Sequence, residues 1–470
     1  MIKTKETVFR EYDIRGKVGQ ELYIEEAYSL AQAIVYFFKQ KNSALSSIVV
    51  GMDGRTHSPK IKKYIIDAVI DSGINVIDIG LCPTPVLYFS LYTLAVDAGI
   101  MITASHNPKE YNGLKLCLYK SSVWGLEVKE IRKLFYQKKH IVTQLKGTYT
   151  KKEIISLYLD WHIERFKDLS GISIPMVIDC GNGATGAVIP QLIKKMKWQN
   201  VQLLYEKVDG EYPNHDANPT CIENMQDVKK LVISQDDAVG IGFDGDGDRV
   251  GVMTEKGQLL AGDRVLSIFA FELLQKHPKA GVVFDVKSSQ GVIDFLQQQQ
   301  ATLHMAPTGH AIIKDTMKQH EALLGGELSC HFFFKDEHFG YDDGVYAFLR
   351  LLRIVKNSKK TVCELSRMAP KKINTIEYSL CCPDEKKKAV IAKIKESFVL
   401  ENKAKLLCID GIRATYENGW GIIRASNTKP AITLRFEAST VKGLKEIKQT
   451  FIDKMVPYFG KSDLEKKLNK

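Results

Sequence analysis

Short apolar segments that end in an acidic turn recur along this chain, and most of them lead toward a helical segment. Segments of this kind lie at Ser47–Met52, Met176–Ile178, Val239–Phe243 and Val282–Phe284, and each is followed directly by an aspartate. Apolar strands that alternate with helices are typical of parallel sheets covered by helices. The pattern therefore predicts an α/β fold of three related units with right-handed βαβ connections.

The first of these units has well-defined local signals. After the strand Ser47–Met52, Ser58 is expected to cap a helix that has Pro59 at its first position. The segment Asn75–Ile79 is the next predicted strand, and a second helix is predicted over Val86–Ala95. Strands and helices therefore alternate in this part of the chain.

The pattern changes after about residue 370, where strands are grouped between flanking helices, as in an α+β domain. The predicted strands are Thr375–Leu380, Gly411–Tyr416, Gly421–Ala425 and Ala431–Ala438, and the predicted helices are Glu385–Leu400 and Val441–Tyr458. A chain of 470 residues is long enough for roughly three to four domains. The expected domains are 1–150, 151–256, 257–370 and 371–470.

Composition excludes several classes of protein. Hydrophobic residues make up 44% and charged residues 26%, as in ordinary globular proteins, and the first residues lack the apolar core of a signal peptide. No apolar run reaches the ~18 residues of a membrane-spanning helix, and nine cysteines without metal-type spacing fit reduced thiols. We therefore expect a cytoplasmic protein with no membrane partner. The net charge of +11 is scattered, which argues against nucleic acid and favours small anionic substrates.

The loop TASHNP follows a short apolar strand, Gly99–Ile102. It places the hydroxyl of Ser105 beside the imidazole of His106, a pairing that can support nucleophilic or acid–base chemistry. Asn112-Gly113 predicts a turn before a second strand, Leu114–Leu118. A serine next to a histidine is a weak signal by itself, so its meaning depends on the loops that follow.

The loop GFDGDGDR predicts a metal site. Its aspartates, Asp244, Asp246 and Asp248, alternate with glycines that let the backbone curl until three carboxylates converge on one hard cation. An EF-hand is the nearest alternative, because Glu255 falls at its twelfth position, but Arg249 stands at its sixth position in place of glycine. The segment that follows, Val250–Met253, is predicted to be a strand rather than a helix. We therefore expect Mg²⁺ in a phosphate-transfer site.

Two further loops carry groups that suit a phosphorylated sugar. The loop RASNTKP offers Arg424, Ser426, Asn427 and Thr428 to a phosphate, with Arg435 at strand spacing downstream. The loop GELSCH offers Glu327 and Ser329, which can exchange hydrogen bonds with sugar hydroxyls, together with His331. These loops predict a phosphate clamp and a sugar-binding loop.

The four loops, in this order, resemble those of the α-D-phosphohexomutase superfamily, and are most similar to its bacterial phosphomannomutase/phosphoglucomutase group. The similarity spans nearly the whole chain and includes Phe9–Gly16, Asp285–Ser288, Thr308-Gly309-His310 and Asp342-Asp343-Gly344. The resemblance implies a heart-shaped molecule of four domains, with three related α/β domains followed by a C-terminal α+β domain. It also implies that the four loops face one cleft.

The resemblance further implies a reaction on mannose and glucose phosphates. Ser105 would carry a phosphoryl group and donate it to the free hydroxyl of a hexose 1- or 6-phosphate. The resulting hexose 1,6-bisphosphate, also the activator, would return its other phosphate to the serine. One Mg²⁺ per active site would be held by Ser105, Asp244, Asp246 and Asp248, with Arg249 beside it. The expected partners are small-molecule sugar phosphates alone, and the expected assembly is a monomer.

A proton must leave the attacking sugar hydroxyl and later return. The family's candidates for this role correspond to Lys115 and His331, and the sequence does not choose between them. Other residues that the resemblance places in the cleft are Tyr12, Arg15, Lys287 and His310. Three positions depart from the family pattern: Cys330 stands where glycine is usual, Lys429 adds a charge where a neutral residue is common, and Ala217 replaces a usual proline.

Three alternatives remain to be weighed against this interpretation. Phosphoglucosamine mutases usually have Ser-Gly-Thr where this chain has Ser426-Asn427-Thr428, which favours a hexose enzyme. A serine hydrolase is disfavoured because the chain lacks a Gly-x-Ser-x-Gly nucleophile elbow. A non-catalytic sugar-phosphate-binding protein would need neither Ser105 nor the three aspartates.

Overall fold

The computed structural model describes residues 2–427 and 430–468, and the chain divides into two compact units. Unit one consists of Met1–Val265 and Ser329–Leu365, and unit two consists of Leu266–Leu328 and Ser366–Lys470. Two helices contain boundaries between the units, α8 (Gly262–Lys276) and α12 (Val362–Ser366). No helix in the described ranges is long and apolar enough to cross a membrane.

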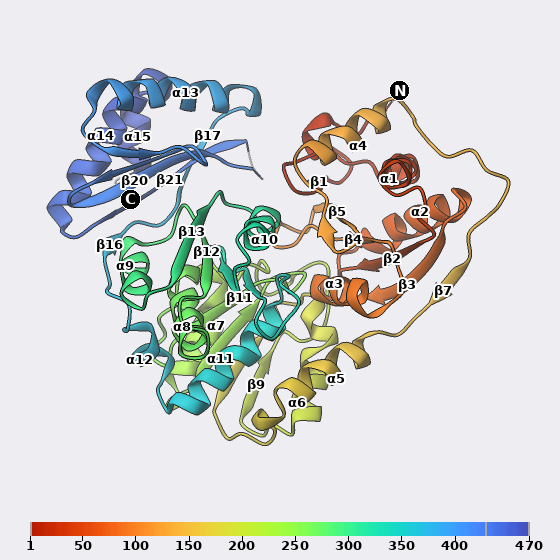
Figure 1. Cartoon of the computed structure of the whole chain (residues 1–470), viewed down its shortest axis with the longest axis horizontal. Coiled ribbons are helices and arrows are strands. Elements are labelled where there is room, and N and C mark those ends of the chain that lie inside the picture. Colours follow the sequence, from red (N-terminus) through yellow and green to blue (C-terminus); the bar gives the residue numbers. More distant parts are fainter. Residues whose placement is uncertain (1, 428–429, 469–470) are drawn as a thin grey trace. The chain divides into compact units, whose positions relative to one another are not determined.

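The first sheet of unit one has seven strands in the order β1-β5-β4-β2-β3-β7, with β6 paired to β5 (Figure 1). The strands are β1 (Ile14–Lys17), β2 (Ser47–Met52), β3 (Asn75–Leu81), β4 (Ala98–Ile102), β5 (Tyr111–Leu118), β6 (Ser121–Ser122) and β7 (Tyr149–Lys151). Strands β4, β2, β3 and β7 are parallel, whereas β5 is antiparallel to both β4 and β1. The predicted parallel α/β core is therefore present, with an antiparallel edge.

Helices cover both faces of this sheet, as Figure 1 shows. The helices are α1 (Ala27–Lys41), α2 (Ser58–Asp71), α3 (Thr84–Thr93) and α4 (Leu126–Tyr136). Ile48 and Ile100 belong to one buried cluster with the apolar residues of α1, α2 and α4. On the opposite face, Gly99 lies against Leu87 of α3, since a Cβ there would be 3.2 Å from the leucine side chain. Successive residues of β4 thus pack against helices on opposite faces of the sheet.

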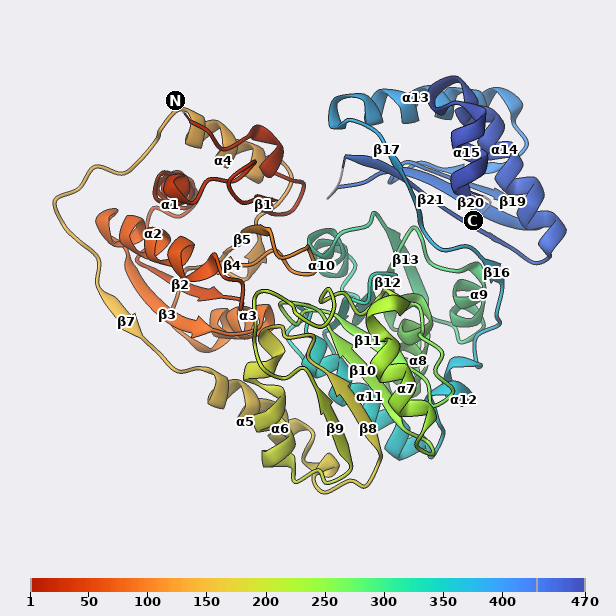
Figure 2. The same ribbon diagram turned by 180° about the vertical axis from the view of Figure 1, so that it is seen from behind.

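The second sheet of unit one has the order β11-β10-β8-β9 (Figure 2). Its strands are β8 (Met176–Asp179), β9 (Val201–Leu204), β10 (Val239–Phe243) and β11 (Val250–Met253), and its helices are α5 (Ile155–Arg165), α6 (Ile189–Met196), α7 (Gln226–Ile233) and α11 (Gly344–Ser358). Val228 and Val232 of α7 pack on Val177 of β8. Phe243 of β10 meets Phe348 of α11 edge to face, with ring centroids 6.1 Å apart. Strand β15 (Phe332–Phe334) also belongs to unit one.

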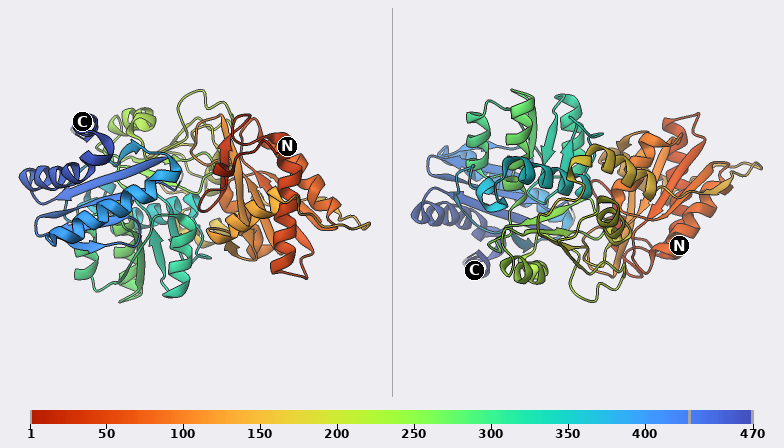
Figure 3. Two further views of the ribbon diagram at one scale, coloured as in Figure 1. Left: turned by 90° about the horizontal axis from the view of Figure 1, so that it is seen from above. Right: turned by 90° about the horizontal axis from the view of Figure 1, so that it is seen from below.

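Unit two contains a parallel set and an antiparallel sheet. The parallel strands are β12 (Gly281–Asp285), β13 (Thr302–Ala306) and β14 (Leu324–Gly326), with helices α9 (Gln290–Gln298) and α10 (His310–Gln319). The antiparallel strands are β16 (Ile373–Asn374), β17 (Tyr378–Cys381), β18 (Lys405–Leu407), β19 (Ile412–Tyr416), β20 (Gly419–Ala425) and β21 (Ala431–Ala438). Helices α13 (Asp384–Glu401), α14 (Val441–Phe459) and α15 (Lys461–Leu468) lie on one side of that sheet, as Figure 3 shows.

Several predicted strands agree with the structure at both ends. They are β2, β10, β11 and β21. Because Val250–Met253 is a strand, the acidic loop is followed by β structure and not by the second helix of an EF-hand. The α+β character of the last domain is confirmed by the antiparallel sheet and its covering helices.

Three local predictions are wrong. Ser58 does not cap α2 but is its first residue, and its hydroxyl instead donates to Asp53 Oδ1 at 2.7 Å. Asn112-Gly113 is not a turn but lies inside β5, paired with β1. Glycine is needed there for close packing, because a Cβ at Gly113 would be 2.1 Å from Ile14 O.

The third error concerns the strand predicted over Thr375–Leu380. The structure has two short strands instead, β16 and β17, both antiparallel to β21. Asn374 pairs with Glu437 and Tyr378 pairs with Leu434, so three residues, 375–377, face only two residues of β21. One extra residue therefore interrupts the ladder as a bulge.

Candidate active site

Ser105 lies in a buried loop directly after β4 and has a left-handed backbone conformation, with φ of 52°. This conformation is uncommon for a residue with a side chain. Thr103 Oγ1 accepts a hydrogen bond from Ser105 N at 2.8 Å, which helps to hold the turn. The side chain of Ser105 is thereby fixed at the end of the central strand.

Arg55 fixes the same loop from the neighbouring strand end. Its Nη2 donates to Ser105 O at 2.7 Å and to Asn107 O at 2.5 Å, and its Nη1 donates to Pro108 O at 2.7 Å. Asp53 pairs with the guanidinium, with Nε to Oδ2 at 3.2 Å. Arg55 was not predicted from the sequence as a site residue. The signal available was an apolar strand that ends in Asp53-Gly54-Arg55.

The three aspartates of the GFDGDGDR loop converge as predicted. Asp244, Asp246 and Asp248 are fully buried, and ligand oxygens from all three lie within 4.8 Å of one another. Ser105 Oγ donates to Asp244 Oδ2 at 2.8 Å. Gly245 allows this approach, because a Cβ there would lie 2.5 Å from Ser105 O. The nucleophile candidate and the acidic cluster are therefore in direct contact.

The acidic cluster has the properties of a metal site. Asp246 Oδ1 and Asp248 Oδ1 are buried and lack a hydrogen-bond donor within the described part of the chain. Burial first, and then the charges of Asp248 and Asp246, raise the pKa of Asp244 well above its ordinary value. Three converging carboxylates with a serine hydroxyl suit a hard divalent cation. The residues present thus fit a metal ion.

Lys115 lies on β5 and supplies positive charge to the acidic cluster. Its Nζ donates to Asp246 Oδ2 at 2.7 Å and also to Asp248 Oδ2. Burial alone would lower the pKa of Lys115, but Asp246 and Asp248 outweigh burial and raise it above its ordinary value. Lys115 is therefore an ammonium beside the acidic cluster, and the two aspartates stabilise its charge.

Thr84, at the start of α3, was not predicted from the sequence. Its Oγ1 donates to Asp246 Oδ2 at 2.6 Å, and its backbone N–H donates to Asp246 O at 2.8 Å. The two residues are 162 positions apart, so no local sequence signal could connect them. Thr84 orients the central carboxylate of the cluster.

Arg249 and His331 form a second pair beside the aspartates. Arg249 Nε donates to His331 Nε2 at 3.1 Å and lies 3.7 Å from Asp244 Oδ2. His331 Nε2 is 3.3 Å from Asp248 Oδ1, and its Nδ1 is 3.2 Å from Ser329 Oγ. The predicted residues Arg249, Ser329 and His331 are thus brought to the acidic cluster.

His106 and the loop before β1 complete the site in unit one. His106 Nδ1 lies 3.1 Å from Ser105 Oγ. Burial, followed by the charges of Arg249 and Arg15, lowers the pKa of His106 well below its ordinary value, so its imidazole is neutral. Arg15 donates to Asp13 Oδ2 at 2.5 Å and to Asn107 Oδ1 at 3.1 Å, which connects that loop to the serine loop. Tyr12 is buried in the same loop.

Unit two gathers the other predicted residues. Lys287 Nζ pairs with Glu377 Oε2 at 2.9 Å, and Arg435 Nη1 donates to Lys287 O at 2.5 Å. Burial alone would lower the pKa of Lys287, but Glu377 and Asp285 raise it above its ordinary value. Lys287 is thus a buried cation held by the C-terminal sheet. Glu377 was not predicted because it lies in the bulge between β16 and β17.

A chain of hydrogen bonds connects the predicted phosphate loop to the predicted sugar loop. Arg424 Nε donates to Asp410 Oδ2 at 2.7 Å, and the same carboxylate oxygen accepts from Thr308 N at 3.0 Å. Asn427 Nδ2 lies 3.4 Å from Thr308 O, and Gly309 N donates to Glu327 Oε1 at 2.7 Å. Asp410 was likewise not predicted from the sequence.

The remaining predicted residues of unit two lie close to this chain. Buried His310 is the first residue of α10, and Ser426 O accepts a hydrogen bond from Lys387 Nζ at 2.5 Å. Thr428 and Lys429 lie outside the described residues. The predictions for those two positions therefore stay predictions.

Cys330 occupies the position of the predicted sugar loop where the family usually has glycine. Its φ is 69°, a left-handed conformation that glycine adopts without strain, and its side chain is buried. Burial raises the pKa of the Cys330 thiol to about 12, so the residue is an uncharged thiol. All nine cysteines are free, as predicted.

Four family models match the chain, and together they span most of it. Phosphoglucomutase/phosphomannomutase alpha/beta/alpha domain I matches residues 6–139, domain II matches 158–257 and domain III matches 261–373. The C-terminal domain of the same family matches residues 380–454. The predicted order of three α/β domains and one further domain is confirmed, while the predicted boundaries stay predictions.

Full-length relatives agree with these models. A phosphomannomutase/phosphoglucomutase of Pseudomonas syringae pv. tomato is 38% identical over 448 residues, which cover 95% of this chain and 94% of the relative. A phosphoglucomutase of Neisseria gonorrhoeae is 36% identical, over 94% of this chain and 95% of its own length.

A solved structure also matches over the full length. The crystal structure of a phosphoglucomutase/phosphomannomutase family protein from Burkholderia thailandensis matches with a TM-score of 0.87 and 32% identity, covering 97% of this chain and 98% of the other. Sequence, domain order and fold agree over nearly all of the chain. This protein is an enzyme of the phosphoglucomutase/phosphomannomutase family.

Proposed function

We propose that the enzyme interconverts hexose 1-phosphates and hexose 6-phosphates of mannose and glucose through a phosphoserine at Ser105. The observation that supports this proposal most strongly is the 2.8 Å hydrogen bond from Ser105 Oγ to Asp244, one of three buried aspartates that converge on one point. A phosphorylated serine there adds roughly two negative charges to an already acidic site. Such a site needs a cation, and the aspartates suit one.

The ion proposed for this site is Mg²⁺, held by Ser105, Asp244, Asp246 and Asp248. When bound, it would supply the positive charge that neutralises the phosphoryl group in the transition state. Arg249 adds a guanidinium 3.7 Å from Asp244, so it is placed to contact the same phosphoryl group. Arg55 keeps Ser105 aimed at this point by its bonds to the loop carbonyls.

Proton transfer is assigned to Lys115 and His331. Lys115 holds a proton as an ammonium beside Asp246, and can return it to a sugar oxygen when the bisphosphate intermediate breaks down. His331 is held by Arg249 Nε–H and Ser329 Oγ, which orient its ring toward Asp248. The neutral imidazole of His106 is proposed to stay within hydrogen-bonding distance of Ser105 Oγ through its Nδ1 atom.

Substrate recognition is assigned to three sets of side chains. Arg424, Ser426, Asn427 and Thr428 would bind the phosphate that is not reacting, with support from Lys287, His310 and Arg435. Glu327 and Ser329 would bind the sugar hydroxyls, and Tyr12 and Arg15 would contact the phosphosugar near the serine loop. A reaction that presents either end of the sugar to Ser105 requires groups that accept both orientations, and guanidinium and hydroxyl donors do so for any phosphate.

Phosphoglucosamine mutase remains the second candidate, because it shares the serine and metal loops. Asn427, in place of the usual glycine of that enzyme, favours the hexose reaction. Its amide lies 3.4 Å from Thr308 O, so its side chain occupies space near the loop that leads to α10.

Purified enzyme with Mg²⁺ and trace glucose 1,6-bisphosphate tests both candidates. Mannose 1-phosphate, glucose 1-phosphate and glucosamine 1-phosphate would be supplied separately to the wild type, to Ser105→Ala and to the matched surface variant Ser121→Ala. We expect turnover of both hexose phosphates by the wild type and Ser121→Ala, and none by Ser105→Ala. Turnover of glucosamine 1-phosphate alone would identify the second candidate, and binding without turnover would indicate a sugar-phosphate-binding protein.

A further inference from the structure

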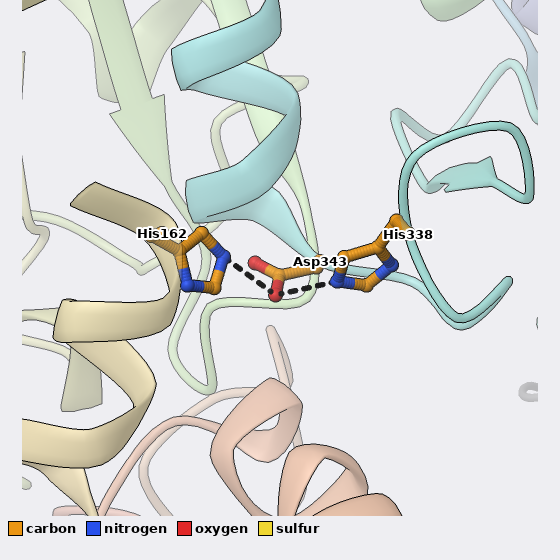
Figure 4. Close-up of side chains that lie close together, drawn as sticks. All are labelled: His162, His338 and Asp343. Carbon is orange, nitrogen blue, oxygen red and sulfur yellow. Dashed lines mark ion pairs between the residues drawn. The ribbon is translucent and has the colours of Figure 1, made fainter. Parts of the chain in front are cut away.

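A second cluster of potential metal ligands lies in unit one, built from His162, His338 and Asp343 (Figure 4). His162 is on α5, His338 lies between β15 and α11, and Asp343 is the N-cap of α11. Figure 4 shows both imidazole rings pointing at one carboxylate oxygen. None of these three residues takes part in the proposed mutase reaction. We call them the His-Asp-His cluster.

The contacts in the His-Asp-His cluster are too long for hydrogen bonds. His162 Nε2 and His338 Nε2 each lie 3.5 Å from Asp343 Oδ2, beyond the usual N–H···O range. Both nitrogens are buried and have no hydrogen-bond partner among the residues that the structure describes. Buried polar atoms without partners are rare and call for an explanation.

The tautomer of His162 adds to the evidence that, within the described ranges, a partner is missing at Nε2. Its Nδ1 lies 2.8 Å from Tyr158 O, and a backbone carbonyl can only accept, so Nδ1 carries the hydrogen. When this ring is neutral, its Nε2 atom presents a lone pair to the carboxylate of Asp343. Two electron-rich atoms that face each other in a dry interior repel unless a cation lies between them.

Asp343 is itself held in place, as metal-binding carboxylates are. Tyr158 Oη donates to its two oxygens at 2.9 and 3.0 Å, and Tyr346 N donates to Oδ1 at 2.9 Å. Each carboxylate oxygen has two lone pairs, so Oδ2 keeps one for a ligand after it accepts from Tyr158.

We propose that the His-Asp-His cluster binds Zn²⁺ through His162 Nε2, His338 Nε2 and Asp343 Oδ2. Tetrahedral zinc with nitrogen and oxygen ligands at about 2.0–2.2 Å places those ligands roughly 3.3–3.6 Å apart. The two 3.5 Å separations in the cluster match this spacing. Two imidazoles and a carboxylate form a known zinc ligand set, which leaves a fourth position for another ligand.

This site differs chemically from the acidic cluster at Ser105. Imidazole nitrogens favour zinc and other transition metals, whereas Mg²⁺ prefers the oxygens of the three aspartates. Aromatic rings surround the cluster: Tyr341 and Tyr346 lie with centroids 4.4 Å from the His338 ring, and Trp161 lies 5.4 Å from it. Because those rings exclude water, a bound ion would join α5 to the start of α11 within unit one.

Cobalt spectroscopy tests the proposal on the full chain. The enzyme would be stripped with EDTA, supplied with excess MgCl₂ to fill the acidic cluster, and titrated with CoCl₂. Tetrahedral Co²⁺ absorbs visible light far more strongly than octahedral Co²⁺, so the His-Asp-His cluster is distinguishable from an all-oxygen site. We expect about one equivalent of tetrahedral Co²⁺ per chain, displaced by ZnCl₂.

Matched variants identify the ligands. His162→Gln, His338→Gln and Asp343→Asn should each lose the cobalt band, while the exposed control His277→Gln should keep it. Asp343→Asn retains a side-chain oxygen for the helix cap, so its fold is the most readily preserved. A wild-type protein with no tetrahedral band, or a band that survives in the two histidine variants, would overturn the proposal.

A second measurement does not depend on the variants folding. Wild-type crystals grown with MgCl₂ and soaked in ZnCl₂ would be examined by anomalous scattering at the zinc edge. A peak within bonding distance of both Nε2 atoms and Asp343 Oδ2 is the expected result. The absence of zinc at that position would refute the site even if zinc bound elsewhere.

Discussion

At the scale of single residues, Ser105 combines backbone strain with a charged neighbourhood. Its left-handed backbone, with φ of 52°, is held by Thr103 and Arg55, and its hydroxyl faces Asp244. Strained residues of this kind cluster at active sites, where the surrounding contacts hold them in place. The chemistry proposed for Ser105 therefore depends on residues that do not themselves touch the substrate.

Lys115→Met tests the charge balance of the acidic cluster. The substitution removes the cation between Asp246 and Asp248 and leaves two buried carboxylates without it, which should destabilise the metal-free protein by about 3–5 kcal/mol. Mg²⁺ should restore much of this loss, because it compensates the same charges. Urea unfolding in EDTA and in MgCl₂ measures both values. Equal stability of variant and wild type in EDTA would contradict the account.

Arg55→Lys tests the positioning of the serine loop. Lysine cannot reproduce the forked contacts of Arg55 with Ser105 O, Asn107 O and Pro108 O, so the loop should shift. A displacement of about 1 Å can reduce catalysis roughly 100-fold. We expect kcat to fall by about that factor while KM changes little. A purely structural role would instead lower the melting temperature and leave kcat of the folded fraction unchanged.

At the scale of elements, strand ends carry much of the site. Ser105 follows β4, Asp244 follows β10 and Lys287 follows β12. The carboxyl ends of parallel strands are the usual place for binding residues in α/β sheets. The apolar-strand and acidic-turn pattern of the sequence predicted the strand ends at Asp244 and Asp285, whereas Ser105 was predicted from the loop TASHNP and Lys287 from the family resemblance.

Long-range partners could not be found in the same way. Thr84 contacts Asp246 across 162 residues, and Glu377 depends on a bulge whose position is set by the pairing of β16 and β17 with β21. Asn112-Gly113 was misread as a turn because local propensity favours one, whereas pairing with β1 makes it strand. Local signals locate reactive side chains, but tertiary pairing selects their neighbours.

Asp78, in the middle of β3, gives a pH-dependent prediction. Burial alone would raise the pKa of Asp78, but hydrogen bonds from Lys62, Gly80 N and Tyr149 lower it below its ordinary value. A carboxylate with a lowered pKa stabilises the fold above its unfolded pKa, and this contribution is lost as the pH falls through its folded pKa.

Asp78→Asn should therefore destabilise the protein by about 1–2 kcal/mol at pH 7. The difference from the wild type should shrink progressively below about pH 4, near the unfolded pKa of aspartate. Urea unfolding across this pH range measures the difference in the free energy of unfolding. The control is Asp67→Asn, a variant of the exposed ion pair between Lys63 and Asp67. A difference that stayed constant with pH would show that the carboxylate charge does not matter.

Arg413 connects the C-terminal sheet to the parallel strands of unit two. Its Nη1 donates to Val286 O at 2.6 Å and to Ser288 O at 3.0 Å, and its guanidinium lies 3.8 Å from the Trp420 ring centroid. Arg413→Ala removes two charge-assisted hydrogen bonds and should cost about 3–5 kcal/mol. Because the Lys287 turn loses its support, KM for sugar phosphate should also rise. Unchanged KM with lowered stability would limit Arg413 to a structural role.

At the scale of the whole molecule, all four family domains are present in one chain of 470 residues. Unit one holds the nucleophile candidate and the acidic cluster, and unit two holds the basic residues proposed to bind phosphate. Domain order and family could be predicted because four separate loop motifs occur along the chain in the same order as in the family. The monomeric state stays a prediction.

The central claim is that phosphate passes through Ser105. The most direct measurement is a single-turnover chase: enzyme labelled with radioactive glucose 1,6-bisphosphate is freed of ligand, mapped by mass spectrometry, and mixed with unlabelled glucose 6-phosphate and Mg²⁺. We expect the label on Ser105 alone, and its transfer to sugar as bisphosphate within one turnover. Label on another residue, or label on Ser105 that does not reach the sugar, would contradict the account.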